Sequence, residues 1–329
     1  MSGETPPLNH LFEAALNFRA MNTTIELLIY APTDKVEEVK SAGHQIKTLF
    51  VESEATLSRF RPESELSKLN RQGYLENSSA LLYENVAAAW QMRDLTSGIF
   101  DPTILDALEA AGYDRSFELL KGGLPQLFTF RQTSRPDAWY NSAQAWIKLD
   151  PLSRSIQLAP GLRLDLGGIA KGSTATRAVE LLRHFPFSSF MLNAGGDMYL
   201  HSSPPQNSQG WRVDIANEAL GATGDITSFL VTNKAVATSS TTGRQWRLGG
   251  QSRHHLIDPR TRQPTNNGLA AATVVAETVQ MADVMAKTAL ILFDPKATQQ
   301  AVENLLALKQ TAGLDTILLQ TAQGELIEL

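Results

Sequence analysis

The stretch Arg163-Leu-Asp-Leu-Gly-Gly-Ile-Ala-Lys-Gly172 joins an apolar run to a helical pattern through a glycine-rich turn. Ala178, Leu181 and Leu182 then fall on one helical face. Free backbone N–H groups at the start of such a helix, its dipole and Lys171 together suit a phosphate group. The spacing matches neither common nucleotide fingerprint, G-x-x-x-x-G-K-[ST] or G-x-G-x-x-G. An ordinary tight strand-to-helix turn explains the glycines equally well, so the residues alone leave both interpretations open.

The composition is that of an ordinary globular protein with a sizeable core, since 43% of the 329 residues are hydrophobic and 19% are charged. A net charge of −5 and the lack of a basic run argue against nucleic-acid binding. The absence of cysteine excludes disulfides, thiolate metal sites, a cysteine nucleophile and lipoprotein acylation. The chain shows no secretory signal and no apolar run near the roughly 20 residues that span a bilayer. We therefore expect a cytoplasmic protein without a membrane span.

The pattern of apolar residues predicts an α+β fold with mainly antiparallel sheets and packed helices. No linker separates two halves, so we expect an N-terminal extension at 1–17 and one domain at 18–329. Helices are predicted at 34–57, 79–97, 169–184, 279–292 and 296–308. Strands are predicted within 16–30 and at 145–149, 155–158, 163–166, 189–193, 197–201, 211–216, 226–231, 235–238, 245–248, 253–257, 270–276 and 315–320.

Three further motifs carry polar groups at strand ends, and each has a plain structural explanation beside the functional one. Asn193-Ala-Gly-Gly-Asp197 allows close approach of a ligand to the backbone, but taken by itself the segment favours a β-turn. Thr238-Ser-Ser-Thr-Thr-Gly243 offers hydroxyls to a phosphate or ribose, but is typical of a polar loop. In an extended strand His254 and His255 point to opposite faces, so they are not expected to share a metal ion.

Asp283 and Lys287 lie four residues apart in the helical pattern and therefore on one face. A surface ion pair is the simple interpretation. The flanking residues, however, are almost all apolar, which indicates a helix buried on most sides. A carboxylate there needs a partner, which is a lysine, a metal or a substrate group.

Seven segments of the chain occur in the order found in one protein family. They are Met21-Asn-Thr23, Leu57-Ser-Arg-Phe-Arg-Pro-Glu-Ser-Glu-Leu-Ser-Lys-Leu-Asn70, Gly98-Ile-Phe-Asp-Pro-Thr103, Asp165-Leu-Gly-Gly-Ile-Ala-Lys-Gly172, Asn193-Ala-Gly-Gly-Asp197, His255-Leu-Ile-Asp-Pro-Arg-Thr261 and Ala282-Asp283. From about residue 18 to about residue 293 the chain resembles the FAD:protein FMN transferase (flavin transferase, ApbE) family. The resemblance implies a T-fold-like α+β fold, FAD in a cleft between sheet and helices, and Mg²⁺ at the FAD diphosphate. It also implies transfer of FMN to a threonine or serine hydroxyl of a client flavoprotein, with release of AMP.

The resemblance further implies roles for individual residues. Met21 and Phe60 are expected to pack on the flavin, Asp165 to meet the nucleotide, and Asp283 to ligate the metal. Asp283 and His255 are the candidates for activating the acceptor hydroxyl. The expected cofactor-binding residues are Met21, Phe60, Ser97, Gly98, Ile99, Asp165, Lys171, Asn193, Gly195, Gly196, Thr238, His255, Leu256 and Ile257. The expected metal site comprises Gly168, Ala170, Asp283 and Lys287.

The chain departs from the family pattern at four positions. Lys287 stands where the family usually has a threonine whose hydroxyl joins the metal, and a protonated amine cannot ligate Mg²⁺. Its charge is instead suited to replace the cation. Phe60 replaces a common tyrosine, Thr176 a common aspartate, and Arg262 the glycine after Asp-Pro-Arg-Thr. Two alternatives to a transferase stay open: an FAD pyrophosphatase, and a non-catalytic FAD-binding protein with a degenerate metal site.

Overall fold

Eight strands form one antiparallel sheet in the order β1-β2-β6-β7-β10-β15-β16-β17. The computed structural model describes residues 11–121 and 146–329, except 208 and 220. The strands are β1 (Leu11–Ala20), β2 (Thr23–Pro32), β6 (Ser189–Ala194), β7 (Asp197–His201), β10 (Lys234–Ser240), β15 (Leu269–Ala276), β16 (Thr316–Thr321) and β17 (Leu326–Glu328). The expected fold class is thus confirmed. β1 begins inside the stretch expected to be an N-terminal extension, the rest of which lies outside the described residues.

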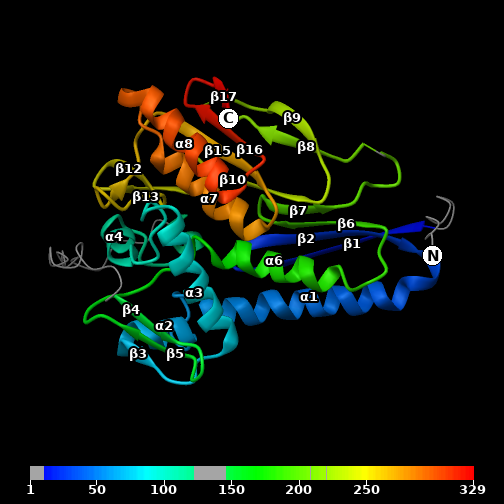
Figure 1. Ribbon diagram of the computed structural model, residues 1–329, viewed down its shortest axis with the longest axis horizontal. Helices are drawn as coiled ribbons and strands as arrows, with labels where there is room; N and C mark the ends of the chain where they lie inside the picture. The colour runs from blue at the N-terminus through cyan, green and yellow to red at the C-terminus, as the bar shows by residue number, and fades with distance from the viewer. Residues whose placement is uncertain (1–10, 122–145, 208, 220) are drawn as a thin grey trace.

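Helices α1 (Val36–Leu57), α6 (Ala170–Leu182) and α7 (Val279–Leu292) cover one face of this sheet, and α8 (Thr298–Ala312) packs on α7 (Figure 1). The main hydrophobic core fills the space between the helices and the sheet. β15 is buried along its whole length because both faces of the sheet are covered there. α7 is also buried on most sides, as its apolar sequence predicts.

The hairpin of β8 (Trp211–Ala216) and β9 (Asp225–Val231) builds a second apolar cluster with strands of the sheet. Trp211, Val213 and Ile215 alternate with exposed residues along β8, so one side of the hairpin is buried. The strand predicted at 211–216 is therefore confirmed.

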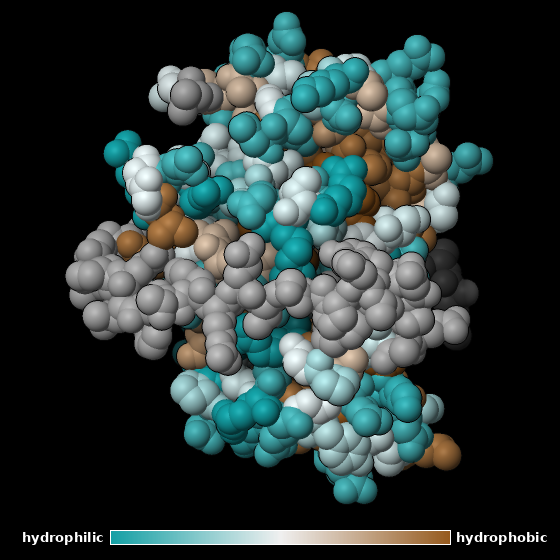
Figure 2. Space-filling view, turned by 90° about the vertical axis from the view of Figure 1, so that its left-hand side faces the viewer, coloured by the Kyte–Doolittle hydropathy of each residue, from teal (hydrophilic) through white to brown (hydrophobic). Residues whose placement is uncertain are grey.

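Short elements gather around the end of the molecule that carries β12, β13 and α4 (Figure 1). They are α2 (Glu65–Gln72), β3 (Tyr74–Leu75), α4 (Leu105–Ala110), α5 (Phe117–Lys121), β4 (Ile147–Asp150), β5 (Ser155–Leu158), β11 (Gln245–Leu248), β12 (Gln251–His254), β13 (Ile257–Asp258) and β14 (Gln263–Pro264). The 16-residue helix α3 (Ala80–Leu95) lies beside them (Figure 1). Two 3₁₀ turns stand elsewhere in the chain, Thr33–Lys35 just before α1 and Pro295–Ala297 between α7 and α8. Viewed from this end, the described surface is mostly hydrophilic (Figure 2). No helix within the described residues combines the length and the apolar character needed to cross a membrane.

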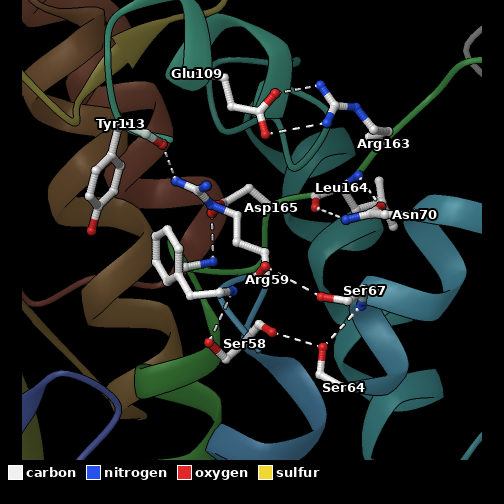
Figure 3. Close-up of polar contacts among 12 residues, drawn as sticks. Ser58, Arg59, Ser64, Ser67, Asn70, Glu109, Tyr113, Arg163, Leu164 and Asp165 are labelled. Carbon is white, nitrogen blue, oxygen red and sulfur yellow. Dashed lines mark hydrogen bonds and ion pairs between the residues drawn. The ribbon is translucent and has the colours of Figure 1, made fainter. Parts of the chain in front are cut away.

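The strand predicted at 163–166 is wrong, because this segment is extended without belonging to a sheet. The side chain of Asn70 takes the place of a neighbouring strand: its amide donates to the Leu164 carbonyl at 2.8 Å and its oxygen accepts from the Leu164 N–H at 2.7 Å (Figure 3). The Asp165 N–H donates to the Pro102 carbonyl at 2.8 Å. The strand predicted at 253–257 is likewise interrupted, since β12 ends at His254 and β13 begins at Ile257.

Candidate active site

Two adjoining cavities open beside the start of α6. Their volumes are about 350 and 520 Å³, within the size range of small-molecule sites. They share six lining residues: Phe60, Tyr113, Asp165, Gly167, Lys171 and Arg244. The Asp165–Gly172 segment therefore forms a wall common to both cavities. A ligand with two distinct halves can extend from one cavity into the other across this wall.

Asp165 organises the common wall through both of its carboxylate oxygens. Oδ1 accepts the Gly167 N–H at 2.7 Å, and Oδ2 accepts the Arg59 Nε–H at 2.5 Å (Figure 3). A Cβ at position 167 would lie 2.8 Å from Oδ1, so any larger residue there would displace the Asp165 carboxylate. The carboxylate that the resemblance places at the nucleotide thus holds Arg59 and the turn in position.

The turn also uses part of its own hydrogen-bond donors. The N–H groups of Ile169 and Ala170 donate to the Leu166 carbonyl at 3.0 and 2.8 Å. With the Gly167 N–H bound to Asp165, the phosphate cradle expected from the sequence has fewer free amides than its length suggests.

Arg59 joins the polar wall to an aromatic one. Its Nη2 donates to the Tyr113 carbonyl at 2.7 Å, and its guanidinium lies 4.1 Å from the centre of the Phe60 ring and 4.9 Å from that of Tyr113. Tyr113 in turn stacks on Trp246, with ring centres 5.3 Å apart. This packed group offers a flat, rigid apolar surface at the edge of both cavities.

Three cations line the 350 Å³ cavity next to the start of α6. Lys171 is hydrogen-bonded to Asp197, and Lys287 to Asp283. Arg244 has no hydrogen-bond or ion-pair partner in the part of the chain that the structure describes. Of these three cations, Arg244 is therefore the one whose charge is not already paired with a carboxylate of the described residues, and it is available to an anionic ligand.

Burial lowers the pKa of the Lys287 amine to about 7, and the neighbouring Lys171 and Arg244 act in the same direction. Asp197 opposes this effect. The direct bond to the Asp283 carboxylate also favours the charged form of the amine.

His255 lines the 350 Å³ cavity, whereas His254 turns its Nε2 to the Thr265 carbonyl at 2.8 Å. The expectation that the two rings face different ways is confirmed. The Nδ1 atom of His255 is buried and has no hydrogen-bond partner among the described residues. Burial holds the pKa of His255 well below its usual value, with Arg244 and Lys287 adding to the decrease. The ring is therefore neutral at physiological pH.

Most residues expected at the site from the sequence line one of the two cavities. These are Met21, Phe60, Ile99, Asp165, Gly168, Ala170, Lys171, Gly195, Gly196, Thr238, His255, Leu256, Ile257, Asp283 and Lys287. Ser97, Gly98 and Asn193 are not among the described lining residues. Ser97 and Gly98 form a left-handed turn after α3, with φ of 51° and 82°. Asn193 donates to Glu26 and accepts the Gly196 N–H, each at 2.8 Å, so it supports the glycine turn from behind.

Sequence reasoning did not single out several lining residues, above all Arg244, Tyr113 and Glu218. Glu218 lies in the loop after β8 and accepts hydrogen bonds from the hydroxyls of Ser240 and Thr242, at 2.9 and 2.5 Å. The run of hydroxyl residues at 238–242 is visible in the sequence as a possible ligand site. Glu218 lies about twenty residues earlier, in a loop that contains no recognisable motif.

The groups around Asp283 do not fit the oxygen shell that Mg²⁺ requires. Mg²⁺ takes about six oxygen ligands in near-octahedral geometry. One oxygen of Asp283, Oδ1, already accepts from Lys287, and the other is buried without a hydrogen-bond partner among the described residues. The Thr288 hydroxyl is buried and donates to the Val284 carbonyl at 2.9 Å. No group of three or more His, Cys, Asp or Glu that could hold a metal occurs within residues 11–121 and 146–329.

The molecule is an α+β protein with two adjoining cavities that share a wall at the start of α6. The family model described as the ApbE family matches residues 21–310, and the chain belongs to this family. Solved structures with the same fold include the ApbE protein from Thermotoga maritima, with a TM-score of 0.77, 22% identity and 96% coverage of each chain. The flavin transferase ApbE from Vibrio cholerae matches with a TM-score of 0.73, 20% identity and 97% coverage of each chain.

Curated relatives carry the name FAD:protein FMN transferase. The protein from Haemophilus influenzae is 25% identical over 301 residues, which cover 89% of this chain and 84% of that protein. The protein from Treponema pallidum is 27% identical over 276 residues, which cover 78% of this chain and 72% of that protein.

Proposed function

We propose that the protein transfers the FMN half of FAD to a threonine or serine hydroxyl of a client flavoprotein and releases AMP. The observation that carries this proposal is the pair of cavities joined at the Asp165–Gly172 wall. Phe60 and Met21 offer an apolar surface to the flavin, and the cations at the start of α6 face the diphosphate. The names of the curated relatives support the same reaction.

In the proposed reaction, the acceptor hydroxyl oxygen attacks the phosphorus of the FMN half. A new oxygen–phosphorus bond forms while the bond from that phosphorus to the bridging oxygen breaks, and AMP leaves with the bonding electron pair. The neutral ring of His255 takes the hydroxyl proton. Lys171, Arg244 and Lys287 stabilise the negative charge that grows on the phosphate oxygens. Asp283 holds Lys287 in place, because its Oδ1 binds the ammonium.

The test is incubation with FAD and a flavoprotein domain that carries an acceptor threonine. We expect the denatured client to keep flavin fluorescence, to gain the mass of FMN less water, and to appear together with an equal amount of AMP. The same client with the acceptor threonine changed to valine is the control and stays unlabelled. A His255→Gln enzyme is expected to bind FAD but to transfer at least about a hundredfold more slowly, because general-base catalysis contributes roughly that much.

Two other outcomes would point to the alternative functions. Release of FMN and AMP at the same rate with and without a client identifies an FAD pyrophosphatase. FAD binding without AMP release under any condition identifies a flavin-binding protein that does not catalyse. Either result contradicts the transferase proposal.

A further inference from the structure

The Lys287 amine is anchored twice on its own helix. Its Nζ donates to the Asp283 carboxylate and, at 3.1 Å, to the Asp283 main-chain carbonyl. The side chain of Lys287 is 15% exposed and that of Asp283 is 2% exposed, so the pair is nearly enclosed. The methylene stem of Lys287 lies against the turn before α6, since a Cβ at Gly168 would be 3.8 Å from its Cδ. The ammonium is thereby held at the cavity wall between α6 and α7.

The Asp283 carboxylate has no accessible oxygen left to bind a metal ion. Oδ1 accepts from Lys287, while Oδ2 faces α6, where a Cβ at Gly172 would be 3.0 Å from it. Oδ2 is also fully buried. The Ala170 carbonyl accepts from the Ser173 and Thr174 hydroxyls at 3.1 and 2.7 Å, so it is oriented along the helix. A divalent ion at this place would have to displace the lysine.

We propose that the ammonium of Lys287 takes the place of a divalent metal ion, so that this protein binds and cleaves FAD without one. This inference rests on the proposed function and concerns the same site. Lys287 and the unpaired Arg244 both line the 350 Å³ cavity, so two cationic side chains stand where a divalent ion would otherwise supply the positive charge. They stabilise the departing AMP phosphate as the bond between the two phosphates breaks. The electron pair and the proton follow the paths given for the transfer reaction.

Lys287→Thr places the neutral hydroxyl that is usual in the family on the same face of α7. This variant distinguishes a site that works without a metal ion from one that needs Mg²⁺. For the unchanged protein, we expect the dissociation constant for FAD to be the same within about twofold in excess EDTA and in Mg²⁺. For Lys287→Thr we expect affinity to fall about tenfold or more in EDTA and to return with Mg²⁺, since each charge-assisted contact is worth roughly a factor of ten. Lys296→Thr, at an exposed lysine after α7, is the matched control and leaves both values unchanged.

Manganese binding to the protein without flavin, measured by electron paramagnetic resonance, gives a second readout. The unchanged protein is expected to bind no stoichiometric Mn²⁺, and Lys287→Thr to gain one site. Lys287→Met keeps the packing volume but no charge and no ligand, so its FAD affinity is expected to fall in both EDTA and Mg²⁺. Unchanged FAD affinity in Lys287→Met would overturn the proposal.

The inference is also wrong if the unchanged protein binds FAD at least tenfold more tightly in Mg²⁺ than in EDTA. It is equally wrong if the unchanged protein binds stoichiometric Mn²⁺ on its own. These binding measurements decide the metal question even if no client is ever labelled, in which case the proposed transfer reaction alone fails. If labelling occurs, we expect it to proceed in excess EDTA at no less than about half the rate in Mg²⁺.

Discussion

Arg244 lines both cavities and has no hydrogen-bond or ion-pair partner among the described residues. Its charge is therefore the one whose removal should affect ligand binding most directly. Changing Arg244 to methionine keeps the length of the side chain and removes the charge. We expect the dissociation constant for FAD to rise by roughly tenfold or more, since hydrogen bonds to charged groups contribute about 1.5–3 kcal/mol. The melting temperature should hardly change. Isothermal titration calorimetry measures the dissociation constant for FAD. The control is Arg247→Met, on the exposed side of β11. Equal FAD affinity in the two variants would remove Arg244 from the site.

Arg59 differs from Arg244 because its guanidinium is already engaged in the fold. It bonds Asp165 and the Tyr113 carbonyl and stacks on two rings, a combination that a lysine cannot reproduce. We predict that Arg59→Lys lowers the free energy of unfolding by about 1–3 kcal/mol and weakens FAD binding as well. Urea denaturation tests the first effect. Arg71→Lys is the control, since Arg71 is exposed near the end of α2 and lines neither cavity. An Arg59→Lys protein that is as stable as the unchanged one would show that the cavity wall does not depend on the hydrogen bonds of the Arg59 guanidinium.

Among single site residues, those that belong to spaced motifs could be predicted from the sequence. Residues that only the folding of distant segments brings to the cavities could not. Glycines, Asp165 and His255 stand in runs whose composition already indicates close approach of backbone to a ligand. Arg244 and Tyr113 stand alone in their local sequence, and only the packing of distant segments brings them to the cavities. Local sequence also could not show that Lys287 and Asp283 satisfy each other, because the alternatives differ only in side-chain direction.

Between elements, the contact of α6 with α7 determines where Asp283 lies, and Gly172 makes that contact possible. A Cβ at Gly172 would lie 2.9 Å from both the Asp283 Cβ and the Gln280 Cα. Alanine favours a helix over glycine by up to about 1 kcal/mol, but backbone and Cβ atoms cannot move aside cheaply. We therefore expect Gly172→Ala to lower the free energy of unfolding by about 1–3 kcal/mol in urea denaturation. Gly243→Ala is the control, because nothing lies within 4 Å of its added Cβ. If Gly172→Ala left the free energy of unfolding unchanged or raised it, the close contact of α6 with α7 would not require glycine at this position.

Elements with a clear period were predictable, and so were some short strands such as β5 at 155–158 and β11 at 245–248, whereas short helices were not. The prediction of α7 at 279–292 and of β8 at 211–216 agrees with the structure because each element buries one consistent set of apolar side chains. The eight-residue helix α2 was not predicted, although Ser64 caps it by accepting the Ser67 N–H. Its position depends on the double hydrogen bond between Asn70 and Leu164, which lie 94 residues apart. The same bond replaced the strand predicted at 163–166, and no local pattern encodes such a contact.

For the whole molecule, buried histidines predict how stability depends on pH. Burial lowers the pKa of His201 and of His254, and holds the pKa of His255 well below its usual value. In the unfolded chain these rings titrate near pH 6.5, so below that pH the unfolded state binds more protons than the folded state. The stability is thus fully present above pH 6.5 and decreases as the pH falls. Between pH 7.5 and 5.5 we expect the free energy of unfolding to drop by about 1–3 kcal/mol in urea titrations without flavin.

Single substitutions separate these histidines from the rest of the protein. His201 stacks on Phe190 with ring centres 4.6 Å apart, and lies outside both cavities. His201→Gln is expected to reduce the difference in stability between pH 7.5 and 5.5 by up to about 1.4 kcal/mol, the contribution of one proton over one pH unit. The matched substitution His44→Gln, on the exposed side of α1, should leave that difference unchanged. If the two variants lose stability equally as the pH falls, His201 is not a source of the pH dependence, and its burial among Phe190 and Arg183 carries no proton linkage.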